Sequence, residues 1–246
     1  MAIQTDEQKK VWNNFLLKYD KKLKNYVPVV SDNTNYSAVI METREHHHLE
    51  VVIKNFMYFL NESNSDIKWG LYIFHSDDNK KFVENFTNDW KNVKLKNIGS
   101  NISNQNDYST ILTNSTFWNT IKSDNILIFQ PDTILLRNGI DKFLGHSYVG
   151  APWLKPKEGK LIGNGGLSFR KKQKMIEIIN SHSTELIDNM YNEDIFFCKY
   201  LKENDVPSLE LCKEFAVEDI YYKNPLGLHQ PKIEPKKLKK ILNELL

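Results

Sequence analysis

Apolar residues recur at helical spacing near both ends of the chain. In the first segment they lie three or four positions apart, at Val11, Trp12, Phe15, Tyr19 and Leu23. This spacing predicts an amphipathic helix over residues 5–24, which Thr5 and Gln8 begin as a capping box. A second apolar stripe follows Pro235 and has lysines on its other face, which predicts a helix over residues 236–246. We expect both helices to pack on the core, with contact to a membrane surface as the alternative for the second.

Between these helices, short apolar runs alternate with helical patterns. The runs that predict buried strands cover residues 37–41, 69–74, 93–98 and 125–129. The helical patterns between the strands cover residues 49–60, 80–88 and 109–121. An alternation of strands and helices is typical of a largely parallel sheet with helices on its faces. The pattern therefore predicts an α/β fold with a Rossmann-type mixed, mostly parallel sheet flanked by helices.

The alternation breaks down after residue 130. Loops that contain Pro and Gly are followed by a short strand at residues 167–170 and by helical patterns near residues 171–181 and 193–204. No internal repeat and no linker rich in Pro, Gly and Ser divides the chain. We therefore predict one domain over residues 1–246, in which the second part is built differently from the first.

Composition and charge exclude several classes of protein. Of the 246 residues, 40% are hydrophobic and 12% aromatic, which is enough core material to exclude a disordered chain. Two cysteines cannot form a disulfide framework. The net charge of +2 does not indicate a nucleic-acid-binding protein. The sequence contains no apolar run long enough to span a membrane and no apolar signal segment at its start, so we expect a soluble, cytoplasmic protein.

Candidate chemistry follows the ends of the predicted strands. In open α/β sheets ligands bind at the carboxyl ends of strands, which directs attention to the loops after Met41, His75 and Phe129. The last of these loops carries Asp132, and a Gly-containing loop near the end of the chain carries His229. Alone, each has an ordinary alternative: an Asp in an Asx turn, and a structural or solvated His. Together, one Asp and one His with phosphate oxygens are a suitable ligand set for Mn²⁺ on a nucleotide diphosphate.

Two further segments carry candidate residues. Residues 162–170 read Ile-Gly-Asn-Gly-Gly-Leu-Ser-Phe-Arg and match neither a dinucleotide-binding GxGxxG motif nor a P-loop. Their glycines permit close approach of the backbone to a ligand, with a plain hairpin as the alternative. Asn192, Glu193 and Asp194 begin a predicted helix. They could simply cap it, or a carboxylate there could accept a proton from a substrate hydroxyl.

Taken in order along the chain, these segments resemble a known class. The ordered set is Glu42-Thr-Arg44, Gln130-Pro-Asp132, Gly165-Gly-Leu-Ser-Phe-Arg170, Asn192-Glu-Asp194 and Gly227-Leu-His229. It is similar to that of the GT-A class of nucleotide-sugar-dependent glycosyltransferases. Residues 37–231 more closely resemble an uncharacterised glycosyltransferase-like domain family of bacteria, fungi and large DNA viruses. This resemblance implies a nucleotide-binding half over residues 37–132 and an acceptor and catalytic half over residues 133–231.

The resemblance also implies roles for residues on the donor side. The nucleotide-sugar-binding positions that it implies are Glu42, Thr43, Arg44, Gln130, Asp132 and Arg170. Asp132 corresponds to the second Asp of the class's Asp-x-Asp motif and His229 to its C-terminal His, so both would be ligands of Mn²⁺ or Mg²⁺. Gln130 replaces the first Asp of that motif. A neutral amide weakens metal ligation, and it could instead hold ribose, phosphate or a metal-bound water.

On the acceptor side, the resemblance implies a catalytic base and an acceptor-binding wall. Glu193 and Asp194 correspond to the acidic pair that supplies the base in inverting members, and we favour Asp194. The acceptor-binding positions are Trp153, Asn164, Gly165 and Gly166, with packing as the equally weighted alternative for Trp153. For Arg170, pairing with an acid is the alternative to contact with the diphosphate.

The sequence thus predicts a metal-dependent, inverting glycosyltransferase that uses a nucleotide diphosphate sugar, most often a UDP-sugar in this class, and a glycan or protein acceptor. One alternative is a non-catalytic glycan- or protein-binding relic of the same fold, which Gln130 favours. Another is a nucleotidyltransferase or phosphohydrolase, which would need a triphosphate-binding loop that is absent near the first strand. The sugar, the acceptor and the oligomeric state remain open, as does the source; for a viral protein the expected compartment is the host-cell cytoplasm.

Overall fold

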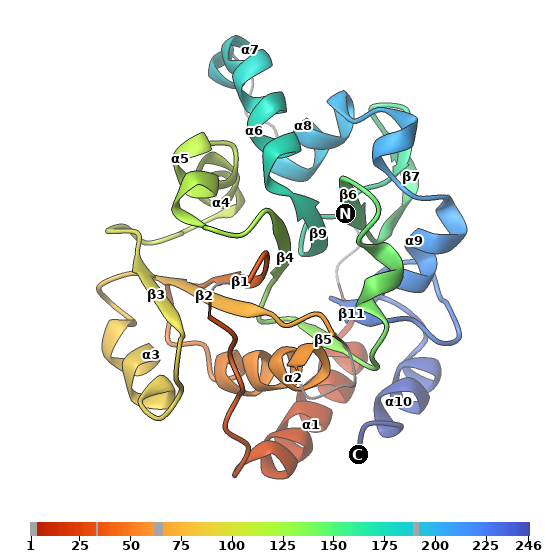
Figure 1. The fold of residues 1–246 in the computed structure, drawn as a ribbon. Coiled ribbons are helices and arrows are strands. Elements are labelled where there is room, and N and C mark those ends of the chain that lie inside the picture. Colours follow the sequence, from red (N-terminus) through yellow and green to blue (C-terminus); the bar gives the residue numbers. More distant parts are fainter. Residues whose placement is uncertain (1–3, 33, 62–65, 189–191) are drawn as a thin grey trace.

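The computed structural model describes residues 4–32, 34–61, 66–188 and 192–246 (Figure 1). A six-stranded sheet with the order β3-β2-β1-β4-β9-β6 forms its centre. The strands of this sheet are β1 (Tyr36–Met41), β2 (Gly70–His75), β3 (Lys94–Asn97), β4 (Asn125–Phe129), β6 (Tyr148–Gly150) and β9 (Leu167–Lys171). The first four are parallel, whereas β9 is antiparallel to β4 and β6 is antiparallel to β9. The predicted mixed, mostly parallel sheet is therefore confirmed.

Helices cover both faces of the sheet (Figure 1). One face carries α1 (Asp6–Leu23), α2 (Leu49–Asn61), α3 (Lys80–Thr87) and α10 (Pro235–Asn243), and the other carries α4 (Gln105–Leu112), α5 (Ser115–Thr120), α6 (Lys172–Ser181) and α8 (Glu193–Tyr200). Strand β1 shows why this happens, because its side chains alternate between two apolar clusters. Ala38 and Ile40 pack in the first cluster, and Val39 and Met41 pack in the second.

The terminal helices pack on the core as predicted. Helix α1 begins with the expected capping box, in which the backbone N–H of Gln8 donates to the Thr5 hydroxyl and the Thr5 N–H donates to the Gln8 side chain. Its apolar face, including Trp12, is buried against the first cluster, and α10 lies beside it (Figure 1). In the described ranges, no helix has the length and apolar character that crossing a membrane requires.

The second part of the chain contains short elements that the sequence pattern does not predict. These are a three-stranded sheet of β5 (Thr133–Leu135), β10 (Ala216–Val217) and β11 (Gly227–His229), a hairpin of β7 (Pro152–Lys157) and β8 (Lys160–Ile162), helices α7 (Ser183–Asp188) and α9 (Leu209–Phe215), and the 3₁₀ turns η1 (Ile140–Phe143) and η2 (Glu203–Asp205). Strands β11 and β5 are antiparallel, with His229 opposite Thr133. This register brings the end of β11 to the loop that follows β4.

Two predicted helices differ from those in the structure. The helix predicted over residues 109–121 begins earlier and is divided into α4 and α5, because the Asn114 side chain accepts a hydrogen bond from the Thr116 N–H (2.9 Å) and caps a new helix. The helix predicted over residues 193–204 ends at Tyr200. There the Lys160 ammonium, on β8, donates to the carbonyl oxygens of Cys198 and Leu201 and so satisfies the end of α8.

Candidate active site

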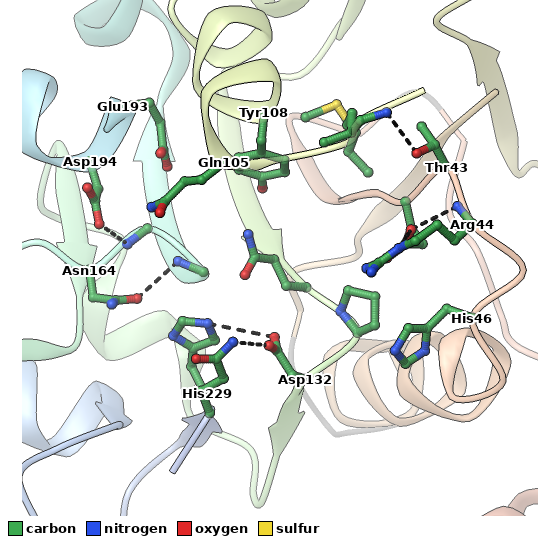
Figure 2. Close-up of a pocket in the computed structure, with 18 of the residues that line it drawn as sticks. Thr43, Arg44, His46, Gln105, Tyr108, Asp132, Asn164, Glu193, Asp194 and His229 are labelled. Carbon is green, nitrogen blue, oxygen red and sulfur yellow. Dashed lines mark hydrogen bonds and ion pairs between the residues drawn. The ribbon is translucent and has the colours of Figure 1, made fainter. Parts of the chain in front are cut away.

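A cavity of about 360 Å³ opens at the carboxyl ends of β1 and β4 (Figure 2). The order of the sheet reverses between these two strands, which is where open α/β sheets bind ligands. The loops after Met41 and Phe129 line the cavity as predicted, but the loop after His75 does not. That loop instead holds the loop after Met41 in place, because the Asn79 side chain donates to the carbonyl oxygen of Glu42 (2.8 Å).

Most residues singled out in the sequence lie together around this cavity. Those that line it are Glu42, Thr43, Arg44, Gln130, Asp132, Asn164, Gly165, Gly166, Glu193, Asp194 and His229. They come from distant parts of the chain and point into one space (Figure 2). Arg170 and Trp153 are absent from this wall.

Asp132 and His229 face each other at the lower edge of the cavity (Figure 2). The pairing of β11 with β5 brings them together, with 3.7 Å between His229 Nε2 and Asp132 Oδ1. Asp132 Oδ2 accepts a hydrogen bond from the Gln230 side chain (2.6 Å). The buried Asp132 Oδ1 and both ring nitrogens of His229 have no hydrogen-bond partner within the described structure. Such unpartnered polar atoms are unusual in a protein interior, and here Asp132 Oδ1 and His229 Nε2 face each other at the edge of a cavity.

These two side chains suit a divalent cation. Each ligand atom lies about 2.1 Å from a bound Mg²⁺ or similar ion, so two ligands of one ion are at most about 4.2 Å apart, which accommodates the Asp132–His229 separation. No group of three or more His, Cys, Asp and Glu side chains among the described residues is arranged to hold a metal. A cation here would therefore need oxygens from a ligand to complete its coordination.

Glu218 is a cavity residue that the sequence reasoning missed. It follows β10, which pairs in parallel with β11, and its Oε2 lies 3.8 Å from His229 Nδ1. Glu218 also bonds the Lys232 ammonium (2.5 Å) and accepts from the Asn164 side chain. Burial alone would raise the pKa of Glu218, but His229 and Lys232 lower it below its ordinary value. The signal for finding it is the run Phe-Ala-Val-Glu, an apolar strand that ends in a carboxylate, as at Asp132.

His229 is held between two carboxylates. Burial on its own lowers the pKa of the imidazole, but Glu218 and Asp132 outweigh this effect and raise it above its ordinary value. Gln230, the next residue, is a second cavity residue missed from sequence. Its backbone N–H donates to the Asp132 carbonyl oxygen (3.0 Å) in addition to the side-chain bond. Asp132 is thereby fixed in position by the neighbour of His229.

The glycine-rich segment fits closely against this site. A side chain at Gly166 would overlap the ring of His229, and a side chain at Gly165 would overlap the carboxylate of Glu193. Asn164 ties the segment in place, since its side-chain oxygen accepts from the Gly166 N–H (3.1 Å). The glycines thus allow the backbone between β8 and β9 to pass directly against the side chains of Glu193 and His229.

Arg170 is fully buried, and the structure places it behind the cavity wall instead of at its surface. Its guanidinium bonds Glu193 (2.9 Å) and lies 4.9 Å from the ring centre of Tyr148. Direct contact with a diphosphate, one of the two expectations, does not fit this burial. The alternative, pairing with an acid, describes the observed contact.

Asp194 lies at the first turn of α8 beside the glycine segment (Figure 2). Its two carboxylate oxygens accept hydrogen bonds from the backbone N–H groups of Gly165 (3.3 Å) and Ile195 (2.7 Å). Burial, reinforced by the neighbouring charge of Glu193, raises the pKa of Asp194 to about 7. A carboxylate with such a pKa can both accept and release a proton near neutral pH.

Glu42, Thr43 and Arg44 form the opposite side of the cavity. The Arg44 guanidinium makes two hydrogen bonds of 2.8 Å to the buried Glu42 carboxylate, while most of its own surface stays exposed. Burial alone would raise the pKa of Glu42, but the hydrogen bonds and charge of Arg44 lower it. The hydroxyl of Thr43 accepts from the Ile102 N–H (3.0 Å), which fixes the loop before α4 to this wall.

Trp153 is buried outside the cavity, which differs from the expectation that it stacks on a sugar ring. Its ring packs against Gly163, and the Lys157 ammonium lies 4.4 Å from its centre. Packing, the alternative weighed from sequence, therefore describes its position. The physical reason is the β7–β8 hairpin, which folds the tryptophan inward instead of leaving it on an open loop.

Several solved structures with a similar fold are glycosyltransferases. LgtC, a galactosyltransferase crystallised with donor and acceptor sugar analogs, has a TM-score of 0.55 and 9% identity, with 84% of this chain and 95% of LgtC covered. WbbM, a bifunctional glycosyltransferase, has a TM-score of 0.54 and 10% identity over 89% of this chain and 51% of its own. The glycosyltransferase GlyE of Streptococcus pneumoniae TIGR4 has a TM-score of 0.50 and 14% identity over 87% of this chain, which spans only 60% of GlyE.

At these identities the likeness concerns the fold, and that fold is of the GT-A glycosyltransferase type. Residues 91–229 match the family described as "Protein of unknown function (DUF5672)". This match covers more than half of the chain, and the chain belongs to that family. No curated protein sequence matches it. The narrower resemblance to a glycosyltransferase-like domain family of bacteria, fungi and large DNA viruses stays a prediction.

Proposed function

We propose that this protein is a metal-dependent glycosyltransferase. It would move a sugar from a nucleotide diphosphate sugar, with UDP-sugars favoured, to a hydroxyl of a glycan or protein acceptor. The observation that carries this proposal is the cavity in which unpartnered atoms of Asp132 and His229 face the same space as the Asp194 carboxylate. The GT-A-type fold supports glycosyl transfer in general. The preference for UDP rests on the resemblance of the ordered motifs.

On the donor side, the wall formed by Glu42, Thr43 and Arg44 would hold the base and ribose. Asp132 and His229 would hold Mn²⁺ or Mg²⁺. When bound, this ion would neutralise the charge that develops on the leaving diphosphate. Glu218 would keep the His229 ring oriented from its far side, as carboxylates do for metal-binding histidines.

On the acceptor side, Asp194 would act as the base. An acceptor hydroxyl lying near Asn164, Gly165 and Gly166 would give its proton to the Asp194 carboxylate. The hydroxyl oxygen would bond to the anomeric carbon as the bond from that carbon to the diphosphate oxygen breaks. Glu193 is engaged with Arg170, which leaves Asp194 as the carboxylate of this pair that can take the proton. One displacement inverts the anomeric configuration.

The first test is unfolding of the protein with UDP, GDP, CDP or ADP, each with and without Mn²⁺. A nucleotide at a hundred times its Kd should add about 2.7 kcal/mol to the free energy of unfolding. We expect this gain with a uridine nucleotide and Mn²⁺, and its loss in Asp132→Ala. Asp194→Asn should keep the gain but lower the transfer rate by about 10²–10⁴-fold. Asp141→Ala, which changes an exposed acid outside the cavity, is the matched control.

Two outcomes would contradict the proposal. If no nucleotide stabilises the protein in the presence of metal, the non-catalytic glycan- or protein-binding alternative would be favoured. Gln130, which stands in place of the first Asp of the motif, is the observation in favour of that alternative. A product whose anomeric configuration is retained, measured by NMR, would exclude the single displacement with Asp194 as base while leaving donor binding intact.

A further inference from the structure

A second cavity, of about 490 Å³, lies between the two terminal helices. Helices α1 and α10 run side by side in the same direction (Figure 1). Gln8, near the start of α1, donates to the Ile233 carbonyl oxygen (2.8 Å), and Lys22, near its end, donates to that of Leu245 (2.5 Å). We call the cavity along this pair the α1–α10 groove. It lies outside the candidate active site and shares no residue with it.

Positive charge gathers on this groove. Lys10 and Lys18 line it from α1, and Lys236 and Lys239 line it from α10. All four are exposed, and no acidic side chain in the described part of the chain forms an ion pair with any of them. Glu7 is the acidic side chain of the groove lining. Four positive charges along one groove repel one another, and an anionic ligand would relieve that repulsion.

The charge is part of a wider asymmetry. Residues 1–24 contain six lysines and three acidic residues, and residues 232–246 contain five lysines and two acidic residues. The whole chain has a net charge of only +2, so the rest of the molecule is net negative. The paired helices are therefore the positively charged part of the protein, and their attraction to an anionic surface would be oriented.

Apolar side chains accompany the lysines. Val11, Phe15 and Leu242 form the floor of the groove. Leu17 is 59% exposed and lies two helical turns from Lys10, on the same side of α1. Lysines that meet phosphate groups, together with apolar side chains that enter the acyl boundary, are the combination by which helices bind an anionic bilayer.

We propose that the α1–α10 groove and Leu17 form a docking surface for membranes that contain anionic phospholipids. Lys10, Lys18, Lys236 and Lys239 would hold lipid phosphates, and Leu17 would lie against the acyl boundary. An exposed Leu17 beyond the rim of the groove favours a broad lipid surface over an acidic helix, which would contact the groove alone. This inference is independent of the proposed transfer reaction.

The test is co-sedimentation of the full chain with vesicles of phosphatidylcholine alone, or with about one third phosphatidylserine. We expect binding only to the vesicles with phosphatidylserine. The combined change Lys10→Glu, Lys18→Glu, Lys236→Glu and Lys239→Glu should weaken binding at least about tenfold. The matched control changes Lys81, Lys91, Lys122 and Lys155 to Glu; these are exposed lysines outside the groove, and the net charge of the control is the same. All eight positions are at the surface, and equal unfolding temperatures would confirm that both variants fold.

Three results would overturn the proposal. The first is absence of binding to phosphatidylserine vesicles, whether or not the protein binds a soluble polyanion such as heparin. The second is equal loss of binding in the groove variant and the control, which would assign the attraction to overall charge. The third is undiminished binding of the groove variant. Nucleotide binding, measured on the same samples, should be unchanged in both variants.

Discussion

At the scale of single residues, the buried pair of Arg170 and Glu193 fixes the edge of the candidate site. The guanidinium has no exposed surface, and its carbon lies 4.9 Å from the ring centre of Tyr148 and 5.5 Å from that of Phe197. It bonds Glu193 at 2.9 Å, and Asp194 is the next residue in the chain. The position of the proposed base therefore depends on an ion pair whose guanidinium lies behind the cavity wall. We expect Arg170 to act through its neighbours, as a positioning residue.

Replacing Arg170 should destabilise the protein strongly. Arg170→Met leaves the Glu193 charge buried without a partner, which we expect to lower the free energy of unfolding by about 3–5 kcal/mol. Denaturant titration measures this loss. Arg137→Met is the control, because the Arg137–Glu214 pair is partly exposed and its removal should cost less than about 1 kcal/mol. If both variants lost a similar free energy of unfolding, the buried pair would contribute no more to stability than the partly exposed one.

Asp194 should leave a signature in the pH dependence of stability. Its pKa is about 7 in the folded protein against an ordinary value of 3.8, so the folded state binds the proton more tightly than the unfolded state. The stabilisation is complete below pH about 4 and disappears as pH rises through about 7. Asp194→Asn stays neutral throughout this range. The free energy of unfolding of the wild type should therefore fall relative to that of the variant between these two pH values, whereas parallel curves would contradict the assignment.

At the scale of elements, the segment between β8 and β9 brings the backbone against side chains of the candidate site. Gly166→Ala places a methyl group in the ring of His229, and we expect a loss of about 1–3 kcal/mol in the free energy of unfolding. The displaced ring should also abolish stabilisation by nucleotide with Mn²⁺. Gly145→Ala is the control, because a methyl group there meets nothing within 4 Å. Unfolding with and without nucleotide measures both effects, and a Gly166→Ala protein that behaves like the control would refute the close fit.

The elements of the first part of the chain could be predicted because they obey local periodicity. Strands β1, β2, β3 and β4 and helices α1, α2 and α3 agree with the predicted ranges to within about two residues. The single helix predicted over residues 109–121 failed because the capping side chain of Asn114 overrides an otherwise continuous pattern. The spacing of apolar residues indicates which face of a helix is buried, but it does not reveal a capping residue that divides the helix in two.

The short strands of the second part could not be predicted in this way. Strands β5, β10 and β11 have two or three residues each, too few to show an alternation. They exist because they pair with one another across long stretches of chain, as Thr133 does with His229. For Glu218 the local sign is a carboxylate after a short apolar run, but the place of both Glu218 and Gln230 in the site follows from strand register.

At the scale of the whole molecule, most of the residues singled out from the sequence line one cavity because they follow the ends of strands. The loops after Met41 and Phe129 meet at the reversal of the sheet order, as the general rule for α/β sheets requires. The positions of Trp153 and Arg170 differed because burial behind the wall depends on the β7–β8 hairpin and on β9. The spacing of residues along the chain does not show whether a side chain faces the cavity or is buried behind its wall.

The pairing of α1 with α10 also has a consequence for how the protein is made. Helix α1 leaves the ribosome about two hundred residues before α10, and contacts between such distant segments form late because they close a long loop. The side of α1 that faces α10, with Val11 and Phe15, must therefore wait in contact with water or with other cellular components while most of the chain is synthesised. We expect the pair of helices to form only after α10 has emerged, so that α1 stays without this partner while the residues between the two helices are synthesised.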